Sequence, residues 1–200
     1  TRSLKKAEHS LSAAAQLLIA ELRKRVQNGV HTFITGQGSR CGDFPPAFRS
    51  GETLSTASLS SVLSFDRDNG YMKVEAGVPL SELAQELQKQ GCPVPFASRT
   101  GTLGGLLASG QWQPSQSRLT GLTAALADGS IVEFGSQSLA PCAGANTARL
   151  FLGSWGAYGV ILSVAIGLSP GTDDGSASQP LAATPVLSGG WPSAFKKVFD

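Results

Sequence analysis

Three segments of the sequence combine glycine with small polar residues: TGQGSRCG at 35–42, RTGTLGG at 99–105 and GSWGAYGVI at 153–161. Glycine lets backbone N–H groups converge and lets a ligand approach the chain closely. The hydroxyls of Ser39 and Thr102 add further hydrogen-bond donors. Such donors suit a pyrophosphate, so the segments are candidate parts of a nucleotide site. Glycine pairs also serve ordinary turns and close packing, and that alternative stays open for any one segment taken alone.

The first segment does not match two common phosphate-binding motifs. TGQGSRCG lacks the Lys and Ser/Thr ending of a P-loop, and prolines follow it where a Rossmann G-x-G-x-x-G would open a helix. Metal-ligand spacing is also missing, because the cysteines lie about fifty residues apart and the histidines are far from each other. These residues are Cys41, Cys92, Cys142, His9 and His31. We therefore expect no metal site, and reduced thiols in a compartment such as the cytoplasm or an organelle interior.

Apolar periodicity and turn signals predict the elements that would position the three segments. Helices are expected over 8–28, 80–90 and 102–109, and one or two helical turns over 146–152. Strands are expected over 31–35, 54–58, 61–66, 71–77, 119–127, 131–135 and 159–168. Asn-Gly at 69–70 and Asp-Gly at 128–129 close two hairpins. Hairpins that alternate with helices indicate an α+β fold rather than a doubly wound parallel sheet.

Composition excludes several classes of protein. Hydrophobic residues make up 41% of the chain and charged residues 15%, which is typical of a sequence with a buried core. The formal net charge is only +2, and the sequence has no stripe of Lys and Arg that would indicate binding to nucleic acid. The best apolar run, 159–168, is about half the length that crosses a bilayer, so we expect no membrane span and a soluble protein. Isolated carboxylates are expected outside the site, with Glu75 on a strand exterior and Asp128 in a turn.

Five stretches in register resemble one protein family. They are TGQGSR (35–40), VEAGVPLSELAQELQKQGCPVPF (74–96), TGTLGGLLASG (100–110), GLTAALADGSIVEFG (121–135) and AGANTARLFLGSWGAYGVI (143–161). Together they resemble the PCMH-type FAD-binding domain of the FAD-linked oxidases, the vanillyl-alcohol-oxidase type. That family includes D-lactate dehydrogenases and glycolate oxidase subunits, and the E subunit of glycolate oxidase looks most similar. The resemblance covers roughly residues 16–170.

The resemblance implies two subdomains around a mixed sheet flanked by helices, with FAD extended between them. The domain would span 8–170, divided into about 8–77 and about 78–170, and 171–200 would be a linker and tail. The first glycine segment would hold the pyrophosphate, and N-terminal amides of the helix at 102–109 would meet the flavin and its phosphates. The cofactor-binding residues implied are Gly36, Gln37, Gly38, Ser39, Arg40, Pro95, Gly101, Thr102, Leu103, Gly104, Gly105, Gly159, Val160 and Ile161.

Several residues depart from the family's usual pattern. Gln37 interrupts a run that usually reads as three glycines, and residues 140–146 lack the usual Lys, Asn, Tyr and Asp. Trp155 stands where an acidic residue is common, and Trp155 and Tyr158 are both bulky enough to fill space that a ligand would occupy. No residue of the chain is assigned a catalytic role, because relatives carry the catalytic groups on a substrate domain that we expect to be missing here.

Two functions follow from these observations. In the first, the chain is the FAD-binding domain or subunit of an oxidoreductase acting on a 2-hydroxy acid such as glycolate or lactate. In the second, it is a diverged, non-catalytic scaffold or accessory subunit of a larger assembly. Both predict other protein subunits as partners, and neither predicts independent catalysis by these 200 residues. The first predicts that Gly104→Val expels FAD with little loss of fold.

Overall fold

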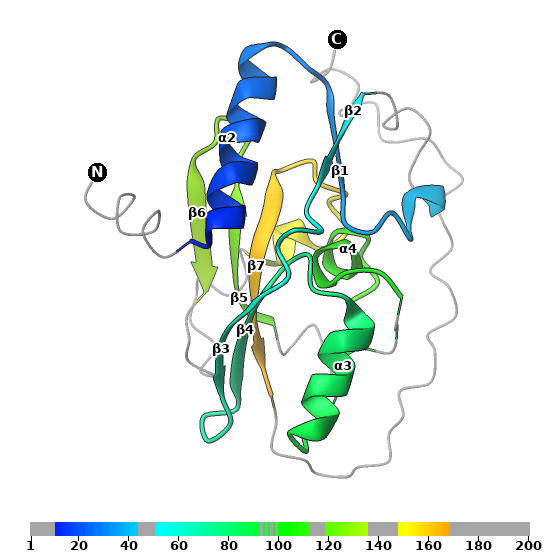
Figure 1. Ribbon diagram of the computed structural model, residues 1–200, viewed down its shortest axis with the longest axis vertical. Helices are drawn as coiled ribbons and strands as arrows, with labels where there is room; N and C mark the ends of the chain where they lie inside the picture. The colour runs from blue at the N-terminus through cyan, green and yellow to red at the C-terminus, as the bar shows by residue number, and fades with distance from the viewer. Residues whose placement is uncertain are drawn as a thin grey trace, which may run out of the picture.

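The computed structural model describes residues 11–43, 51–92, 94, 96, 98, 100–112, 119–135 and 148–168 of the 200-residue chain. Its strands form two sheets (Figure 1). A five-stranded antiparallel sheet has the order β3-β4-β7-β5-β6, and β1 pairs with β2 in parallel. The α+β class is confirmed, and the expected mixture of parallel and antiparallel pairing is divided between the two sheets.

The element bounds agree with most of the sequence predictions. The strands are β1 (Thr32–Thr35), β2 (Glu52–Ser55), β3 (Val62–Asp66), β4 (Tyr71–Glu75), β5 (Leu119–Ala125), β6 (Ile131–Gly135) and β7 (Val160–Gly167). The helices are α2 (Ala13–Gln27), α3 (Leu80–Lys89) and α4 (Leu103–Ala108), with 3₁₀ turns η1 (Cys41–Asp43) and η4 (Arg149–Phe151). Both predicted hairpins are confirmed. The strand expected over 54–58 lies earlier, at β2, and the helical structure expected over 146–152 is the short turn η4 in the described residues.

Strand β7 is the central strand, and it contains a β-bulge. Leu162 belongs to the core cluster under α2, whereas Ile161 and Val164 belong to the cluster under α3 and α4. Two consecutive β5 residues pair with Ile161 and Ser163, so Leu162 is an extra residue in the register. Side chains of a strand normally alternate between faces, and an extra residue resets that alternation. The bulge therefore allows β7 to supply apolar side chains to both layers along its length.

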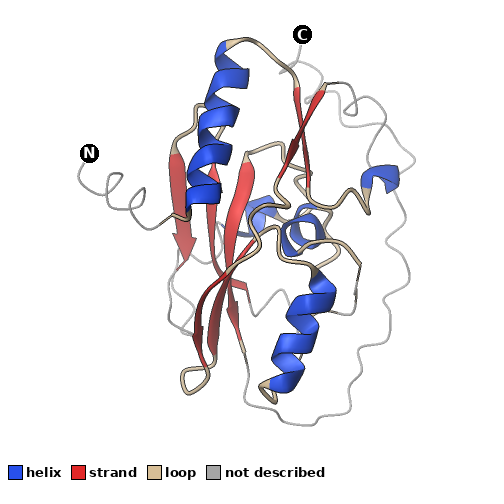
Figure 2. Cartoon of the chain, viewed as in Figure 1, coloured by secondary structure: helices blue, strands red, loops and turns tan. Residues whose placement is uncertain are grey.

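Helix α2 covers one face of the five-stranded sheet (Figure 2). It begins after Ser12, whose hydroxyl oxygen accepts a hydrogen bond from the Ala15 amide at 3.2 Å, which is the N-cap arrangement. Lys24 and Arg25 lie in its last turn, where cations are favourable next to the helix C-terminus. The buried residues of this layer are Ala15, Leu18, Ile19, Leu22, Leu54, Leu59, Ala125, Ile131, Val160 and Leu162.

Helices α3 and α4 pack on the opposite face of the sheet. The apolar face of α3 consists of Leu80, Leu83, Ala84 and Leu87, all buried at the spacing of one helix face. The leucines of α4, which are Leu103, Leu106 and Leu107, are buried in the same cluster with Met72, Val74, Leu122, Val164 and Ile166 of the sheet. Helix α4 is thereby fixed against β7, and its N-cap residue Thr102 lies close to Gly36 in the loop after β1.

Glu75 is buried, so the prediction that its side chain lies on the exposed face of a strand is wrong. Its side chain is 2% exposed at the end of β4. One carboxylate oxygen accepts a hydrogen bond from the Ser12 hydroxyl, and the other accepts from the Ser61 amide at 2.8 Å. Ser12 lies 63 residues away in the sequence, a contact that local patterning does not reveal. Asp128 does lie in a turn, as predicted, where hydrogen bonds from Ser130 lower the pKa of its carboxyl.

Replacement of Ser12 tests this junction between α2 and the sheet. We expect Ser12→Ala to lower the free energy of unfolding by about 2 kcal/mol, because it removes a helix cap and leaves a buried carboxylate oxygen without its donor. Urea denaturation followed by far-ultraviolet circular dichroism measures the change. Ser12→Thr keeps the hydroxyl and is the matched control. Equal stability of Ser12→Ala and the unmodified chain would contradict the assignment.

The division of the chain into two subdomains near residue 77 stays a prediction. Strands β3 and β4 precede that position, and β4 pairs with β7 in the five-stranded sheet. The sheet therefore contains strands from both sides of the proposed boundary. Residues 8–10 of the first predicted helix and the tail expected over 171–200 lie outside the described residues.

Candidate functional site

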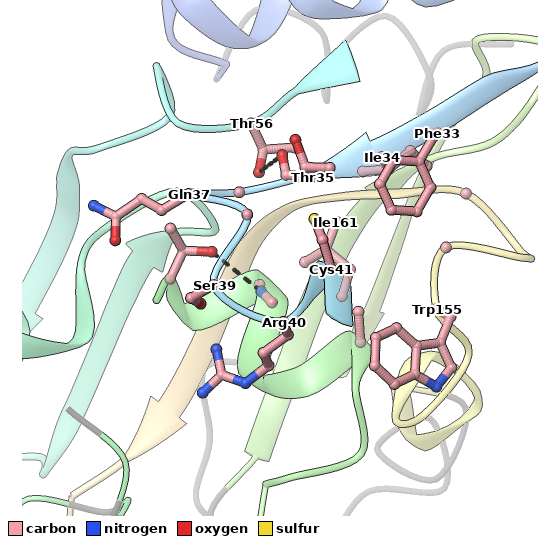
Figure 3. Close-up of a pocket in the computed structure, with 18 residues that line it drawn as sticks. Phe33, Ile34, Thr35, Gln37, Ser39, Arg40, Cys41, Thr56, Trp155 and Ile161 are labelled. Atoms are coloured by element: carbon pink, nitrogen blue, oxygen red, sulfur yellow. Dashed lines mark hydrogen bonds between the residues drawn. The ribbon is translucent and has the colours of Figure 1, made fainter. Parts of the chain in front are cut away.

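A pocket lies where the end of β1, the following loop, α4 and the loop before β7 meet (Figure 3). About 70 Å³ of it is open to water. That volume seats one part of an extended ligand rather than a whole dinucleotide. The residues that line it are Phe33, Ile34, Thr35, Gly36, Gln37, Gly38, Ser39, Arg40, Cys41, Thr56, Thr102, Gly104, Gly105, Ala108, Trp155, Gly156, Gly159 and Ile161. All three glycine segments singled out from the sequence therefore contribute to one pocket.

The loop after β1 presents backbone donors to this pocket. Gly38 has a φ of 75°, a left-handed conformation that glycine adopts without steric cost, and its carbonyl accepts from the Cys41 amide at 3.1 Å. Within the described part of the chain, no hydrogen bond uses the amides of Gln37, Gly38 and Ser39. Consecutive amides around a left-handed residue form a concavity that favours anions. This loop therefore fits a pyrophosphate.

Gly36 brings this loop against the N-terminus of α4. A Cβ atom at Gly36 would overlap the Oγ1 atom of Thr102. Thr102 is 1% exposed, and its Oγ1 accepts from the Gly105 amide at 3.3 Å, so its side chain is held in place. Gly36 is thus required for close approach of two chain segments rather than for a turn.

The amides at the start of α4 are used within the protein. The Leu103 amide donates to the Val78 carbonyl at 3.1 Å, and the Gly104 amide donates to the Ala76 carbonyl at 2.7 Å. The Gly105 amide donates to Thr102, as described above. Each of these three amides already has a protein acceptor, and the expected contact of this helix end with the flavin and its phosphates stays a prediction.

Gly104 has a packing role that the sequence did not indicate. A Cβ atom there would lie 2.8 Å from the Cβ atom of Ala76 and 3.0 Å from the Ala76 carbonyl oxygen. Both atoms belong to the turn after β4 and have little freedom to move. This packing favours a different result from the sequence-based prediction, and we now expect Gly104→Val to destabilise the fold.

Arg40 joins the two sides of the pocket. Its Nε donates to Oε1 of Gln111 at 2.7 Å, and its Nη2 donates to the Ser98 hydroxyl and the Thr100 carbonyl, each at 3.0 Å. A Cβ atom at Gly101 would overlap the side chains of Ser39 and Arg40, so the backbone at Gly101 lies close against this guanidinium. The result is a fixed positive charge beside the free amides of the β1 loop.

The remaining wall comes from β7 and the loop that precedes it. Gly159 passes so close to β5 that a Cβ atom would overlap the Ala125 carbonyl oxygen. Ile161 lines the pocket next to it with a side chain that is 6% exposed. Trp155 lines the pocket as well, but Tyr158 does not and is half exposed instead. Of the two bulky residues that depart from the family pattern, only Trp155 occupies this site.

The structure brings most of the predicted site residues together. Those that line the pocket are Gly36, Gln37, Gly38, Ser39, Arg40, Thr102, Gly104, Gly105, Gly159 and Ile161. Leu103 and Val160 are buried in the two core clusters, Gly101 packs behind Ser39 and Arg40, and Pro95 lies outside the described residues. The sequence analysis missed Phe33, Ile34, Thr35, Cys41, Thr56, Ala108 and Gly156. The available signal for the first three was their place at the end of the predicted strand at 31–35, directly before the first glycine segment.

The described residues give no support for a metal site or a membrane-spanning helix. No group of three or more His, Cys, Asp or Glu side chains there can hold a metal ion. Cys41 and Cys92 are free thiols. None of the described helices is long and apolar enough to cross a bilayer.

Known proteins resemble this chain in sequence and in fold. Residues 13–135 match the family described as FAD binding domain. D-lactate dehydrogenase of Anaerostipes hadrus is 26% identical over 68% of this chain and 31% of its own length, and glycolate oxidase subunit GlcE of Escherichia coli is 23% identical over 78% and 47%. Mitochondrial D-2-hydroxyglutarate dehydrogenase of Bos taurus is 30% identical over 56% and 23%. The chain thus spans less than half the length of each of these relatives.

A solved structure shows the same fold. Alkyldihydroxyacetonephosphate synthase superposes with a TM-score of 0.63 at 21% identity, over 77% of this chain and 32% of the synthase. The resemblance stated from the sequence is confirmed, since the family match covers more than half of the chain and the relatives include D-lactate dehydrogenases and glycolate oxidase subunits. The chain belongs to the FAD binding domain family, and FAD is its cofactor.

Proposed function

We propose that this chain is the FAD-binding part of an oxidoreductase that oxidises a small 2-hydroxy acid such as glycolate or lactate. The observation that carries the proposal is the loop at 37–39, whose free amides lie beside the fixed charge of Arg40 in a pocket of the matching family. Pyrophosphate is a dianion, and converging amides with an adjacent guanidinium are its common partners in proteins. The named relatives that act on 2-hydroxy acids support the substrate class.

The proposed roles follow from the contacts. Gly36, Gln37, Gly38, Ser39 and Arg40 hold the pyrophosphate, and the surface of Thr102 and Gly105 forms the facing wall. The buried leucines of α4 give that wall a rigid support, because they are locked in the core. The main chain at 159–161 closes the pocket from the β7 side. FAD, when bound, supplies the hydride acceptor for the substrate carbon that carries the hydroxyl group.

The chain's contribution to catalysis is binding and orientation of the cofactor. We assign no residue of the described part to removal of the hydroxyl proton. This chain matches less than half the length of these relatives, so we propose that these groups come from another segment or from a partner subunit. The free thiols of Cys41 and Cys92 fit a reducing compartment.

The first test is the cofactor content of the purified chain. We expect a yellow protein that releases one FAD per chain after denaturation, measured from the visible spectrum of the supernatant. A colourless chain that does not take up added FAD would contradict the proposal. That result would favour the alternative of a scaffold subunit. The observation that supports this alternative is that Trp155, where the family commonly has an acidic residue, lines the pocket.

The second test is anaerobic reduction of the flavin in the chain together with its co-purifying partners. We expect glycolate or lactate to bleach the flavin absorbance. Propionate is the matched control, because it has the carboxylate and carbon chain of lactate but no hydroxyl to oxidise. Equal responses to lactate and propionate would refute the 2-hydroxy acid assignment while leaving FAD binding intact.

A further inference from the structure

Trp155 has an unusual backbone conformation inside the cofactor pocket. Its φ is 53°, and in the described part of the chain it is the one non-glycine residue with a positive φ. A bulky residue in this left-handed region is strained, because its Cβ approaches its own carbonyl group. Such strain persists where the surroundings impose it, and it is often found at ligand sites.

Backbone hydrogen bonds impose this conformation. The Trp155 amide donates to the Ala108 carbonyl at 2.9 Å, and the Gly153 amide donates to the Leu107 carbonyl at 3.0 Å. Both acceptors lie at the end of α4, which is anchored in the core. On the other side, a Cβ atom at Gly156 would lie 3.0 Å from Cδ1 of Ile34 in β1. The loop that carries the indole is therefore hydrogen-bonded to the end of α4 and closely packed against β1.

The indole lies at the apolar end of the pocket. Phe33 and Ile34 line that end together with Trp155, Ile161 lies near the middle beside Cys41, and Gln37, Ser39 and Arg40 lie toward the other end (Figure 3). The donors for a pyrophosphate and an aromatic surface are thus arranged along one pocket. A planar heterocycle joined to a pyrophosphate has this combination of apolar and anionic parts.

We propose that Trp155 stacks against the adenine ring of FAD and so determines the affinity for the ADP half of the cofactor. This inference rests on the proposed function of the pocket. FAD has two planar ring systems, but the flavin ring has to remain in reach of the substrate. The end at Trp155 lies between β1 and a loop tied to α4, so it suits the ring that takes no part in the reaction.

The test is isothermal titration of the FAD-free protein with ADP and, separately, with FMN. We expect Trp155→Leu to weaken ADP binding roughly tenfold, as loss of one aromatic stacking partner does, and to leave FMN binding unchanged. Trp155→Phe keeps an aromatic face and should restore most of the ADP affinity. Tyr158→Leu is the matched control, because it removes an aromatic residue of the same loop that does not line the pocket.

Trp155→Gly separates stacking from a structural role. Glycine accepts the positive φ without strain, so we expect this variant to keep the thermal midpoint of the unmodified apo chain while it loses ADP affinity as Trp155→Leu does. Unchanged ADP affinity in Trp155→Leu, or weakened FMN binding in its place, would overturn the inference. Absence of FAD binding by the unmodified chain would overturn the proposed function first, and this inference with it.

Discussion

Gly36→Ala is expected to lower the affinity for FAD roughly 100-fold, which corresponds to about 2.7 kcal/mol. The added Cβ would overlap Oγ1 of Thr102, a buried side chain held by the Gly105 amide. The loop at 36–40 is more exposed than Thr102, so the loop moves and the core does not. A displacement of about 1 Å at a binding constellation is enough for a loss of this size. Titration of the apo protein with FAD measures the affinity.

A double variant provides the control for Gly36→Ala. Thr102→Ala removes the Oγ1 and Cγ2 atoms that the new side chain would meet. We expect Gly36→Ala in the Thr102→Ala background to cost less than tenfold in FAD affinity, because the nearest remaining side-chain atom, Cβ of residue 102, lies 3.0 Å away. The thermal midpoint of Gly36→Ala should remain within a few degrees of the unmodified chain. Equal losses in both backgrounds would show that the contact with Thr102 is not the cause.

Gly104→Ala is expected to lower the free energy of unfolding by about 2 kcal/mol, as overpacking of a closely fitted core does. Its Cβ would lie 2.8 Å from Cβ of Ala76, and relief of that contact requires α4 to move away from the turn after β4. That movement also stretches the hydrogen bond between the Gly104 amide and the Ala76 carbonyl, now 2.7 Å. Urea denaturation of the apo protein gives the change in stability.

The adjacent glycine gives a matched comparison. A Cβ atom at Gly105 would lie 3.2 Å from Oγ1 of Thr102 and 3.8 Å from Nη1 of Arg40, which is tolerable with a small adjustment. Alanine is also favoured over glycine within a helix. We expect Gly105→Ala to be as stable as the unmodified chain or more so. Equal destabilisation by the two substitutions would show that α4 simply does not tolerate side chains at either position.

Local patterns in the sequence were sufficient for most of the fold. The hairpins at 61–77 and 119–135, and the helix at 80–90, were predictable because each depends on alternation, spacing or a turn within a short stretch. The position of Glu75 was not, because its partner Ser12 lies 63 residues away. The bulge at Leu162 was equally hidden, since a run of apolar residues reads the same whichever face each one occupies.

The candidate site was also predictable only in part from the sequence. The glycine segments identified where the pocket would be, because backbone accessible to a ligand needs residues without side chains. Their individual roles could not be read from the sequence, since Gly36 and Gly104 differ only in what lies opposite them in space. The use of the α4 amides by Ala76 and Val78 was likewise a matter of tertiary contact. Trp155 was noticed as a departure, but its side chain could be placed in the pocket only with the structure.

The extra residue in β7 determines which apolar layer each paired residue of that strand faces. Residues before Leu162 and residues after it are in opposite phase relative to the two apolar layers. Deletion of a paired β7 residue on either side of Leu162 would reverse the faces of the residues beyond it, exposing side chains that now pack under α2 or under α3 and α4. Insertions and deletions among the paired residues of β7 are therefore expected to be more disruptive than loss of Leu162 itself, which leaves both faces of the strand in place.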